Sequence, residues 1–409
     1  MLAKAKAAQS YFACVTGDQR NRTLLAMGTA IRDNVSAILD ANRDDVSRAS
    51  DEGLSGAMLA RLQLSTAKLE QLAGGLVMVS QLADPIGRGE GLRQLNNGLK
   101  LEQVRVPLGV IGLIFESRPG VVVEAGGLTV KSGNAIILRG GHEAFQTNRI
   151  LADMWRTVLQ SLDLPADVVQ MVNHTGREYV HGMMHLKGLD LLIPRGGAGL
   201  IQTVIEDATV PVIETGVGNC HLYVDRACNM DMAISILRDG KVGNPAVCNA
   251  LETVLVHEQV AHEFYTRARK VLKEDGVVWH GDDSVCQWIP EAMRATEEDW
   301  RTEYLSLDIA AKVVPDVHAA LAHIADFGTG HSEAIVTNDY LTGQLFLDKV
   351  DAAAVYWNAS TRFTDGFEYG LGAEVGISTQ KLHARGPMGL TALTTIKTIA
   401  WGSGQTRDM

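Results

Sequence analysis

The sequence predicts an α/β protein in which helices cover parallel sheets. After Pro107, short β-branched runs alternate with segments of helical periodicity. Each strand–helix–strand passage needs a crossover connection, which places the two strands parallel in one sheet. The chain has 409 residues, more than one compact core usually holds, so we expect two or three domains.

The first half of the chain begins with helices and then alternates. Residues 20–80 are expected to be helical, because apolar residues recur at helical spacing from Leu24 to Ile38. Residues 84–105 are polar and glycine-rich and suit an extended hairpin. Strands are expected at 109–115, 135–138, 168–172, 191–194 and 210–213, and helices at 121–131, 142–162 and 198–205.

The second half repeats the alternation less regularly. A helix is expected at 233–237, a strand at 252–257 and a long charged helix at 259–273. Residues 276–305 are expected to be irregular, and further strands are expected at 309–314, 334–337 and 353–356. Residues 358–391 are rich in glycine and weakly periodic. Long segments of this kind within an enzyme are usually functional.

Composition excludes several classes of protein. The formal net charge of −11 argues against a nucleic-acid partner and an anionic membrane surface. No apolar stretch approaches the about 20 residues that a membrane span needs, and the N-terminus lacks the apolar core of a secretory signal. Five cysteines without a CxxC pair suit a reducing compartment. We therefore expect a cytoplasmic protein.

Arginine stands in glycine-rich surroundings five times, at Arg118, Arg139, Arg195, Arg362 and Arg385. Three of these directly follow a predicted strand, and open α/β sheets bind ligands at the carboxyl ends of their strands. The guanidinium fork fits carboxylate and phosphate, and adjacent glycines leave room for the ligand. The alternative is that each arginine pairs with a surface carboxylate. Together they favour a site for an anionic ligand.

Two cysteines lie next to polar turns, Cys220 and Cys248. Cys248 lies between a predicted helix and a predicted strand, after a glycine and a proline, where a loop can expose its thiol to a cleft. A reactive thiolate needs a cationic environment, which Lys241 or the arginine segments could supply. Cys248 is the favoured nucleophile and Cys220 the alternative. The others, expected to be small packing residues, are Cys14, Cys228 and Cys286.

Three further features carry weaker signals. Glu214 ends a predicted strand, where it can be a general base or cap a turn. His181 and His185 have the i, i+4 spacing of zinc ligands on a helix, but no HExxH motif or clear third ligand accompanies them, so a solvated pair is favoured and no metal is expected. Residues 196–199 are glycine-rich and follow a strand, but lack the spacing of the dinucleotide fingerprint.

Longer motifs carry a resemblance to a known family. Residues 106–119 read VPLGVIGLIFESRP and residues 358–365 read NASTRFTD. These segments resemble the gamma-glutamyl phosphate reductase family of the aldehyde dehydrogenase superfamily. Further segments match in the family's order, so that the resemblance runs from about residue 100 to the C-terminus: 131–141, 193–199, 248–253 and 371–389.

The resemblance implies an aldehyde-dehydrogenase-like fold with three parts. A parallel-sheet nucleotide-binding domain is expected over residues 1–230, with residues 84–106 as an oligomerisation hairpin. An α/β catalytic domain that carries the cysteine is expected over 231–358. Residues 359–409 are expected to return to the nucleotide-binding domain and end in an oligomerisation tail. The family therefore implies a homo-oligomer, at least a dimer.

The resemblance also implies a reaction. The family reduces L-glutamyl 5-phosphate with NADPH to L-glutamate 5-semialdehyde and phosphate, in proline biosynthesis, and a complex with glutamate 5-kinase is a further expectation. Cys248 matches the nucleophile, Ser117 an oxyanion-stabilising position and Glu214 the base of hydrolytic relatives. Expected cofactor contacts are Arg139, Gly196, Gly197 and Glu303, and expected substrate contacts are Arg118, Asn249, Arg362, Lys381, His383 and Arg385.

Two departures from the family pattern stand out. Asn244 occupies a position before the proline of the cysteine loop where a basic residue is expected, and the Phe-Gly-Pro sequence expected near Glu303 is absent. Three alternatives therefore stay open: a hydrolytic NAD(P)-dependent aldehyde dehydrogenase with Glu214 as its base, a zinc-dependent dehydrogenase, and a non-catalytic partner of the kinase.

Overall fold

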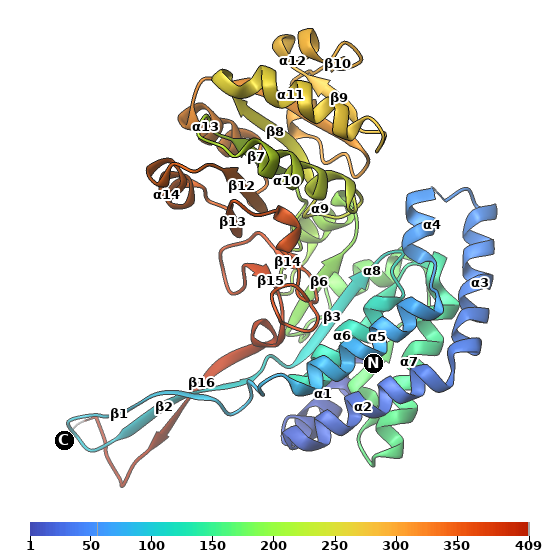
Figure 1. The fold of residues 1–409 in the computed structure, drawn as a ribbon. Coiled ribbons are helices and arrows are strands. Elements are labelled where there is room, and N and C mark those ends of the chain that lie inside the picture. The colour runs from blue at the N-terminus through green and yellow to red at the C-terminus, as the bar shows by residue number, and fades with distance from the viewer. Residues whose placement is uncertain (55, 408–409) are drawn as a thin grey trace. The chain divides into compact units, whose positions relative to one another are not determined.

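A computed structural model describes residues 1–54 and 56–407. The chain forms two compact units (Figure 1). The first unit comprises Met1–Thr215, Gly370–Gly376 and Met388–Met409. The second unit comprises Gly216–Tyr369 and Ile377–Pro387. Within the described residues, none of the helices is long and apolar enough to cross a membrane.

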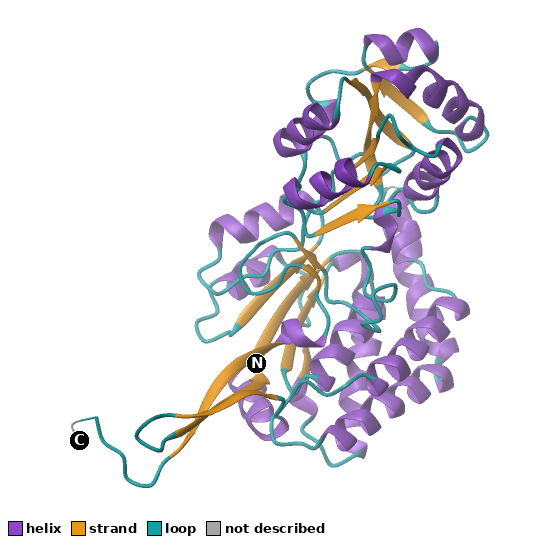
Figure 2. Cartoon of the chain, turned by 60° about the vertical axis from the view of Figure 1, so that its left-hand side comes forward, coloured by secondary structure: helices purple, strands orange, loops and turns teal. Residues whose placement is uncertain are grey.

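The first unit is built on a four-stranded parallel sheet with the order β5-β4-β3-β6. Nearly every residue of these strands is buried, as expected where helices cover both faces (Figure 2). The strands are β3 (Val110–Phe115), β4 (Ala135–Gly140), β5 (Val169–Met171) and β6 (Leu191–Arg195). The helices are α1 (Leu2–Phe12), α2 (Gly17–Asp33), α3 (Val35–Asp51), α4 (Gly56–Leu62), α5 (Thr66–Gln81), α6 (Gly120–Lys131), α7 (Phe145–Ser161), α8 (Arg177–Met184) and α9 (Ala198–Asp207).

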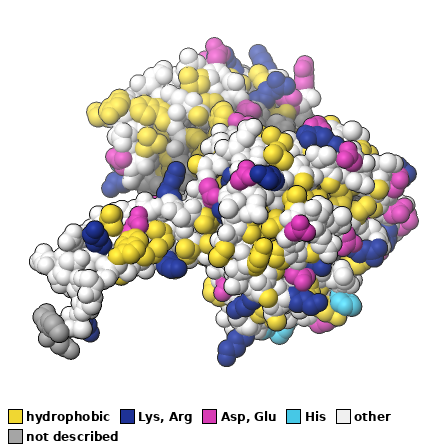
Figure 3. Space-filling view, turned by 90° about the horizontal axis from the view of Figure 1, so that it is seen from below, with side chains coloured by type: hydrophobic (Ala, Val, Ile, Leu, Met, Phe, Trp, Pro, Cys, Tyr) yellow, Lys and Arg dark blue, Asp and Glu magenta, His cyan; other side chains and the backbone are white. Residues whose placement is uncertain are grey.

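A three-stranded antiparallel sheet also belongs to the first unit. β1 (Gly89–Gln94) pairs with β2 (Lys100–Pro107), which pairs along its other edge with β16 (Thr394–Trp401). This confirms the predicted hairpin and adds a C-terminal strand to it. Large apolar side chains of the sheet lie on the surface, among them Leu92, Ile396 and Trp401. Figure 3 shows such hydrophobic side chains in yellow among polar ones on one face of the molecule.

The second unit is built on a seven-stranded sheet of the order β10-β9-β11-β8-β7-β12-β13, in which all neighbours are parallel. Successive strand residues face opposite sides, so Leu222 joins one buried cluster and Tyr223 the other. The strands are β7 (Cys220–Val224), β8 (Leu251–His257), β9 (Val278–Gly281), β10 (Met293–Arg294), β11 (Asp308–Val314), β12 (Ser332–Val336) and β13 (Ala354–Trp357). The helices are α10 (Met230–Val242), α11 (Glu258–Leu272), α12 (Asp283–Trp288), α13 (Val317–Phe327) and α14 (Tyr340–Lys349). β14 (Ile377–Ser378) and β15 (Gly386–Pro387) form a separate small pair.

The structure corrects several boundaries. The first unit ends at Thr215 rather than at 230, because β7 pairs with β8 and β12 in the second unit's sheet. The strand expected at 210–213 is wrong: only a single bridge joins Val212 to Leu192. The stretch expected to be irregular, 276–305, contains β9, α12 and β10. The second unit runs to Tyr369 rather than ending at 358. Of the remaining expected return segment, Gly370–Gly376 and Met388–Met409 belong to the first unit, and Ile377–Pro387 stays in the second.

Candidate active site

Cys248 lies on the loop between α10 and β8, as the sequence predicted. Cys248 is half-buried. The backbone of Gly218 passes so close to this loop that a Cβ at Gly218 would lie 1.5 Å from the Cys248 carbonyl oxygen. Only glycine permits this approach, and it fixes the backbone of the cysteine loop against the segment that enters β7.

Cys220 lies in β7 and has a different environment. It is completely buried, and its Sγ donates to the Cys248 carbonyl oxygen over 3.2 Å. Burial, with the nearby Glu333 carboxylate adding to it, raises the pKa of the Cys220 thiol well above its usual value. A buried thiol of high pKa is a poor nucleophile, which leaves Cys248 as the better candidate of the two.

The remaining cysteines agree only in part with the expectation of packing residues. Cys228 and Cys286 are half-buried, and burial raises the pKa of both thiols. Cys14 is exposed, so its expected packing role is wrong.

Asn249 joins the cysteine loop to the segment after β13. Its side-chain amide donates to the carbonyl oxygens of Arg362 (3.3 Å) and Thr364 (2.9 Å). The Arg362 guanidinium in turn donates to the Asn249 side-chain oxygen, and the Thr361 hydroxyl donates to the Asn249 carbonyl over 2.7 Å. The structure therefore brings Arg362 beside the residue that follows Cys248.

Lys381 and Arg385 converge on one carboxylate. Both form ion pairs with Asp351, with 2.8 Å between Arg385 Nη2 and Asp351 Oδ1. His383 lies between them in the sequence, on exposed backbone with a φ of +70°. Sequence reasoning missed Asp351, which lies about thirty residues away and has no local signal.

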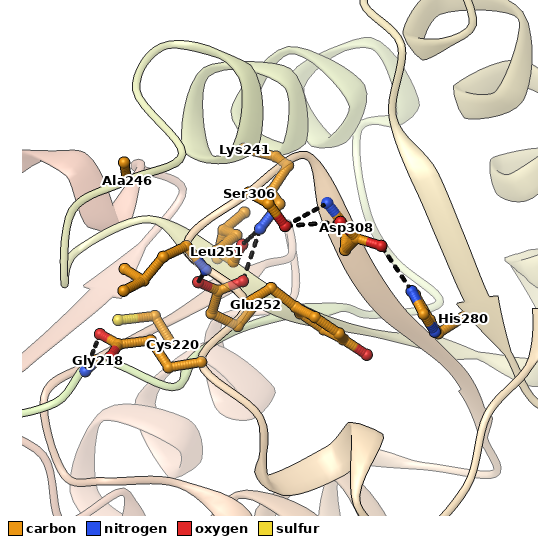
Figure 4. A network of polar contacts seen from close by, with 12 residues as sticks. Gly218, Cys220, Lys241, Ala246, Leu251, Glu252, His280, Ser306 and Asp308 are labelled. Atoms are coloured by element: carbon orange, nitrogen blue, oxygen red, sulfur yellow. Dashed lines mark hydrogen bonds and ion pairs between the residues drawn. The ribbon is translucent and has the colours of Figure 1, made fainter. Parts of the chain in front are cut away.

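Lys241, the candidate cation for the Cys248 thiolate, is fully buried and held by other groups. Its Nζ lies 2.6 Å from Glu252 Oε2 and 2.9 Å from the Leu251 carbonyl (Figure 4). The other Glu252 oxygen accepts from the Leu305 N–H over 3.1 Å. Burial lowers the pKa of Lys241 and raises that of Glu252, to about 7.

Figure 4 shows this ion pair in a network of polar contacts in which Asp308 binds Ser306 and His280. Close to it, Glu303 Oε1 accepts from the Gly218 N–H over 2.7 Å. Because the Gly218 backbone lies against Cys248, the structure places Glu303 near the cysteine loop. The two carboxylates thus connect the cysteine loop and its following strand to the segment 303–305.

The first unit contains a cavity of about 690 Å³ at the carboxyl ends of β3 and β4. Arg139 lines it and donates from Nη2 to the carbonyls of Thr175 (2.6 Å) and Gly176 (3.2 Å). Its Nε is buried and has no hydrogen-bond partner among the described residues. Burial lowers the pKa of Arg139, although nearby carboxylates oppose the shift. Apolar residues complete the lining: Leu54, Ile114, Val180, Met184 and Leu200.

Gly196 and Gly197 lead into α9, which forms one wall of this cavity. The Gly197 N–H donates to Glu116 Oε2 over 2.9 Å. A Cβ at Gly196 would lie 2.4 Å from the same oxygen, so the Glu116 side chain would have to move to accommodate one. Backbone N–H groups at a helix start suit an anionic ligand. The cavity lining thus combines Arg139 and Arg177 with the carboxylates Glu116 and Glu143.

Ser117 and Glu214 also belong to the first unit. Ser117 is buried with a φ of +43°, and its N–H and hydroxyl both donate to Glu143 Oε1, over 2.6 and 2.9 Å. Its hydroxyl hydrogen is therefore engaged. Arg118 follows directly, before α6 begins. Glu214 is half-buried at the end of the unit. No local sequence pattern marks Glu143, whose role depends on this tertiary contact.

Comparisons with known proteins agree with the motifs. A model of the aldehyde dehydrogenase family matches residues 1–290. The gamma-glutamyl phosphate reductase of Carboxydothermus hydrogenoformans is 51% identical over 405 residues, which cover 99% of this chain and 98% of that protein. That of Moorella thermoacetica is 51% identical over 406 residues, covering 99% and 97%.

Solved structures give the same result. The crystal structure of gamma-glutamyl phosphate reductase from Thermotoga maritima matches with a TM-score of 0.94 at 41% identity, covering 99% of this chain and 98% of that chain. An acetylating aldehyde dehydrogenase from Geobacillus thermoglucosidasius matches with a TM-score of 0.72 at 17% identity, covering 99% and 96%. The second likeness concerns the fold alone, and both confirm the predicted fold.

Proposed function

Because the chain belongs to the gamma-glutamyl phosphate reductases of the aldehyde dehydrogenase family, we propose that it reduces L-glutamyl 5-phosphate to L-glutamate 5-semialdehyde and phosphate, with NADPH, in proline biosynthesis. The observation that carries the proposal is the contrast between the two candidate cysteines. Cys248 lies half-buried on a loop bounded by close glycine packing, while Cys220 beneath it is a buried thiol of raised pKa.

The chemistry proceeds in two stages. The Cys248 thiolate attacks the acyl carbon, and the phosphate group leaves with the electrons of the carbon–oxygen bond, which gives a thioester. The backbone N–H of Cys248 is the candidate donor to the oxyanion. NADPH, when bound, supplies the hydride for reduction of the thioester carbon. Expulsion of the Cys248 thiolate then releases the aldehyde.

Ser117 was the second candidate for the oxyanion. Its hydroxyl donates to Glu143, so it could serve the oxyanion only by leaving that carboxylate. Glu214 is not needed as a base in this reaction, since a base that activated water would divert the thioester to glutamate.

The cavity of the first unit is proposed to hold the adenosine part of the nucleotide. Its volume lies within the range of small-molecule sites. Arg139 lines this cavity and is the proposed cation for a ribose phosphate, because its buried Nε–H has no hydrogen-bond acceptor among the described residues. Gly196 and Gly197 would contact the diphosphate at the start of α9, which requires the Gly197 N–H to leave Glu116 Oε2. Glu303 is proposed to hold the nicotinamide ribose.

The proposed substrate carries two anionic groups, an α-carboxylate and an acyl phosphate. Cationic residues of the second unit are candidates to bind both groups. Arg362 is held beside Asn249, next to the nucleophile, and is the leading candidate for the phosphate. Lys381 and Arg385, held together by Asp351, are proposed for the α-carboxylate, with His383 between them. Arg118 of the first unit remains a further proposed contact.

The sheet β1-β2-β16 is proposed as an oligomer interface. β1 is exposed along its whole length, and Leu92, Ile396 and Trp401 present apolar surface. A sheet edge with unpaired backbone groups readily pairs with another chain. A homo-oligomer, at least a dimer, would cover both features.

The reverse reaction tests the proposal. Glutamate 5-semialdehyde and NADP are supplied, and reduced nicotinamide is followed with and without inorganic phosphate. The proposal predicts that turnover depends on phosphate. Turnover that is equally fast without phosphate would instead indicate a hydrolytic aldehyde dehydrogenase, with Glu214 as its base.

A further inference from the structure

We propose that His181, His185 and Asp207 form a binding site for a divalent transition-metal ion at the rim of the cavity in the first unit. The sequence offered the two histidines at i, i+4 but no third ligand. The structure supplies it from a different helix, because Asp207 ends α9 beside the C-terminal end of α8. The inference concerns metal binding alone and does not depend on the proposed reaction.

The ligand atoms converge on one point. Asp207 Oδ2 lies 3.5 Å from His181 Nε2 and 3.6 Å from His185 Nε2. The ligand atoms of all three residues lie within 4.8 Å of one another. Metal–ligand bonds of about 2.0–2.1 Å place tetrahedral ligands roughly 3.3 Å apart. Small side-chain rotations would therefore complete the geometry.

The backbone and an outer contact hold the ligands in this arrangement. His185 Nδ1 lies 3.2 Å from the Thr209 hydroxyl, so its other ring nitrogen is directed toward Asp207. The Thr209 N–H donates to the Met184 carbonyl over 2.9 Å, which ties the end of α9 to the end of α8. Metal-binding histidines usually have such a hydrogen bond to the nitrogen that does not bind the metal.

The ligand set indicates the class of metal. Two imidazoles and one carboxylate suit Zn²⁺, Co²⁺, Ni²⁺ or Cu²⁺ better than Mg²⁺ or Ca²⁺, which prefer oxygen ligands alone. Three protein ligands leave a coordination position open. Because His181 and Asp207 also line the cavity, that position is available to water or to a ligand at the cavity rim.

A simpler explanation is that Asp207 forms ion pairs with the two histidines and nothing more. Both explanations account for the two distances. The two explanations differ in whether a metal ion binds to the three side chains together. Partly exposed ion pairs by themselves contribute little to the stability of the fold.

Cobalt titration separates the two explanations. The protein carries Cys248→Ala, so that the candidate nucleophile does not bind metal, and is titrated with Co²⁺ while visible absorption is followed. His185→Ala and Asp207→Asn are compared with His262→Ala, which removes an exposed histidine of the second unit. We expect one cobalt site whose affinity falls at least about tenfold in the first two variants and is unchanged in the control. Equal affinities in all three variants would overturn the proposal.

Thermal unfolding gives a second readout, because a ligand that binds only the folded state raises Tm. Zn²⁺ should raise the Tm of the His262→Ala variant and not that of the His185→Ala variant, both in the Cys248→Ala background. The two variants should have the same Tm in the presence of a chelator, which shows that folding is intact. An equal rise with Zn²⁺ in both would contradict the assignment.

Discussion

Replacement of Lys241 by Met tests how much the buried ion pair between Lys241 and Glu252 contributes to stability. Both side chains of the Lys241–Glu252 pair are fully buried, and 2.6 Å separates their charged atoms. Loss of one partner leaves a buried charge without compensation, which costs about 3–5 kcal/mol. In a domain of this size each kcal/mol lowers Tm by about 2–4 °C. We therefore expect Lys241→Met to lower the Tm of the second unit by roughly 6–20 °C at pH 8.

The loss should shrink at lower pH. Burial already raises the pKa of Glu252 to about 7, and removal of Lys241 takes away the charge that opposes this shift. A carboxyl whose folded pKa lies above its unfolded value of about 4.3 stabilises the fold at low pH, and this contribution is lost as pH rises through the folded pKa. At pH 5.5 the variant holds a neutral Glu252 and should unfold much closer to the wild-type temperature.

Differential scanning calorimetry at pH 5.5 and pH 8 makes the measurement. Arg238→Met is the matched control, because Arg238 lies one turn earlier on α10 and pairs with Asp275 at the surface. It should change Tm little at either pH. An equal loss at both pH values in Lys241→Met would refute the reasoning, since it would mean that the Glu252 charge is not the cause.

Three further predictions concern the candidate site. Iodoacetamide at pH 8 should alkylate Cys248 and leave Cys220 unmodified, because burial raises the pKa of the Cys220 thiol. Peptide mass spectrometry measures the labelling of each cysteine. Faster labelling of Cys220 than of Cys248 would exclude Cys248 as the nucleophile. Gly218→Ala should lower kcat at least about tenfold, since the new Cβ would collide with the Cys248 carbonyl and displace the loop. Gly74→Ala, where nothing lies within 4 Å, should leave kcat unchanged, and equal kcat values for the two variants would count against the close-packing argument. Arg139→Gln should raise the KM for NADPH about tenfold or more while kcat changes little, because a hydrogen bond to a charged group contributes about 1.5–3 kcal/mol. Steady-state kinetics measures both constants. An unchanged KM would show that Arg139 does not bind the nucleotide.

The fold could be predicted where the apolar pattern is strong. The buried strands β3, β4, β6 and β8 were expected close to their observed positions because each contains a short apolar run. β7 was missed because its sequence, Cys-His-Leu-Tyr-Val, contains a polar histidine. That histidine is buried, and its Nδ1 lies 3.0 Å from Glu333 Oε2, a partner that only the tertiary structure supplies.

The strand expected at 210–213 shows the opposite error. The residues have the apolar pattern of a strand, but only Val212 reaches a neighbour, through a single bridge to Leu192. A strand needs a partner along its length, and the sequence of one segment does not contain that information. α13 was missed although a signal exists, since Asp316 caps its start by accepting from the Ala319 N–H.

The residues of the candidate site likewise divide into those that a sequence pattern marks and those that only the tertiary structure reveals. Local sequence and the motif resemblance both pointed to Cys248 and Arg362, and the resemblance alone pointed to Asn249. The structure brings Asn249 and Arg362 into direct contact. The acidic partners were missed: Asp351 holds Lys381 and Arg385, and Asp207 faces His181 and His185. Each is distant in sequence from the residues that it contacts, and an isolated acidic residue has no local pattern that marks it.

A single-turnover experiment tests the central claim, a thioester at Cys248 whose natural acceptor is phosphate. The enzyme is mixed with glutamate 5-semialdehyde and NADP in the absence of phosphate, and reduced nicotinamide and the mass of the Cys248 peptide are followed. We predict a burst of no more than one reduced nicotinamide per chain, a glutamyl group on Cys248, and steady turnover once phosphate is added. A burst that persists in Cys248→Ala, or sustained turnover without phosphate, would contradict the account.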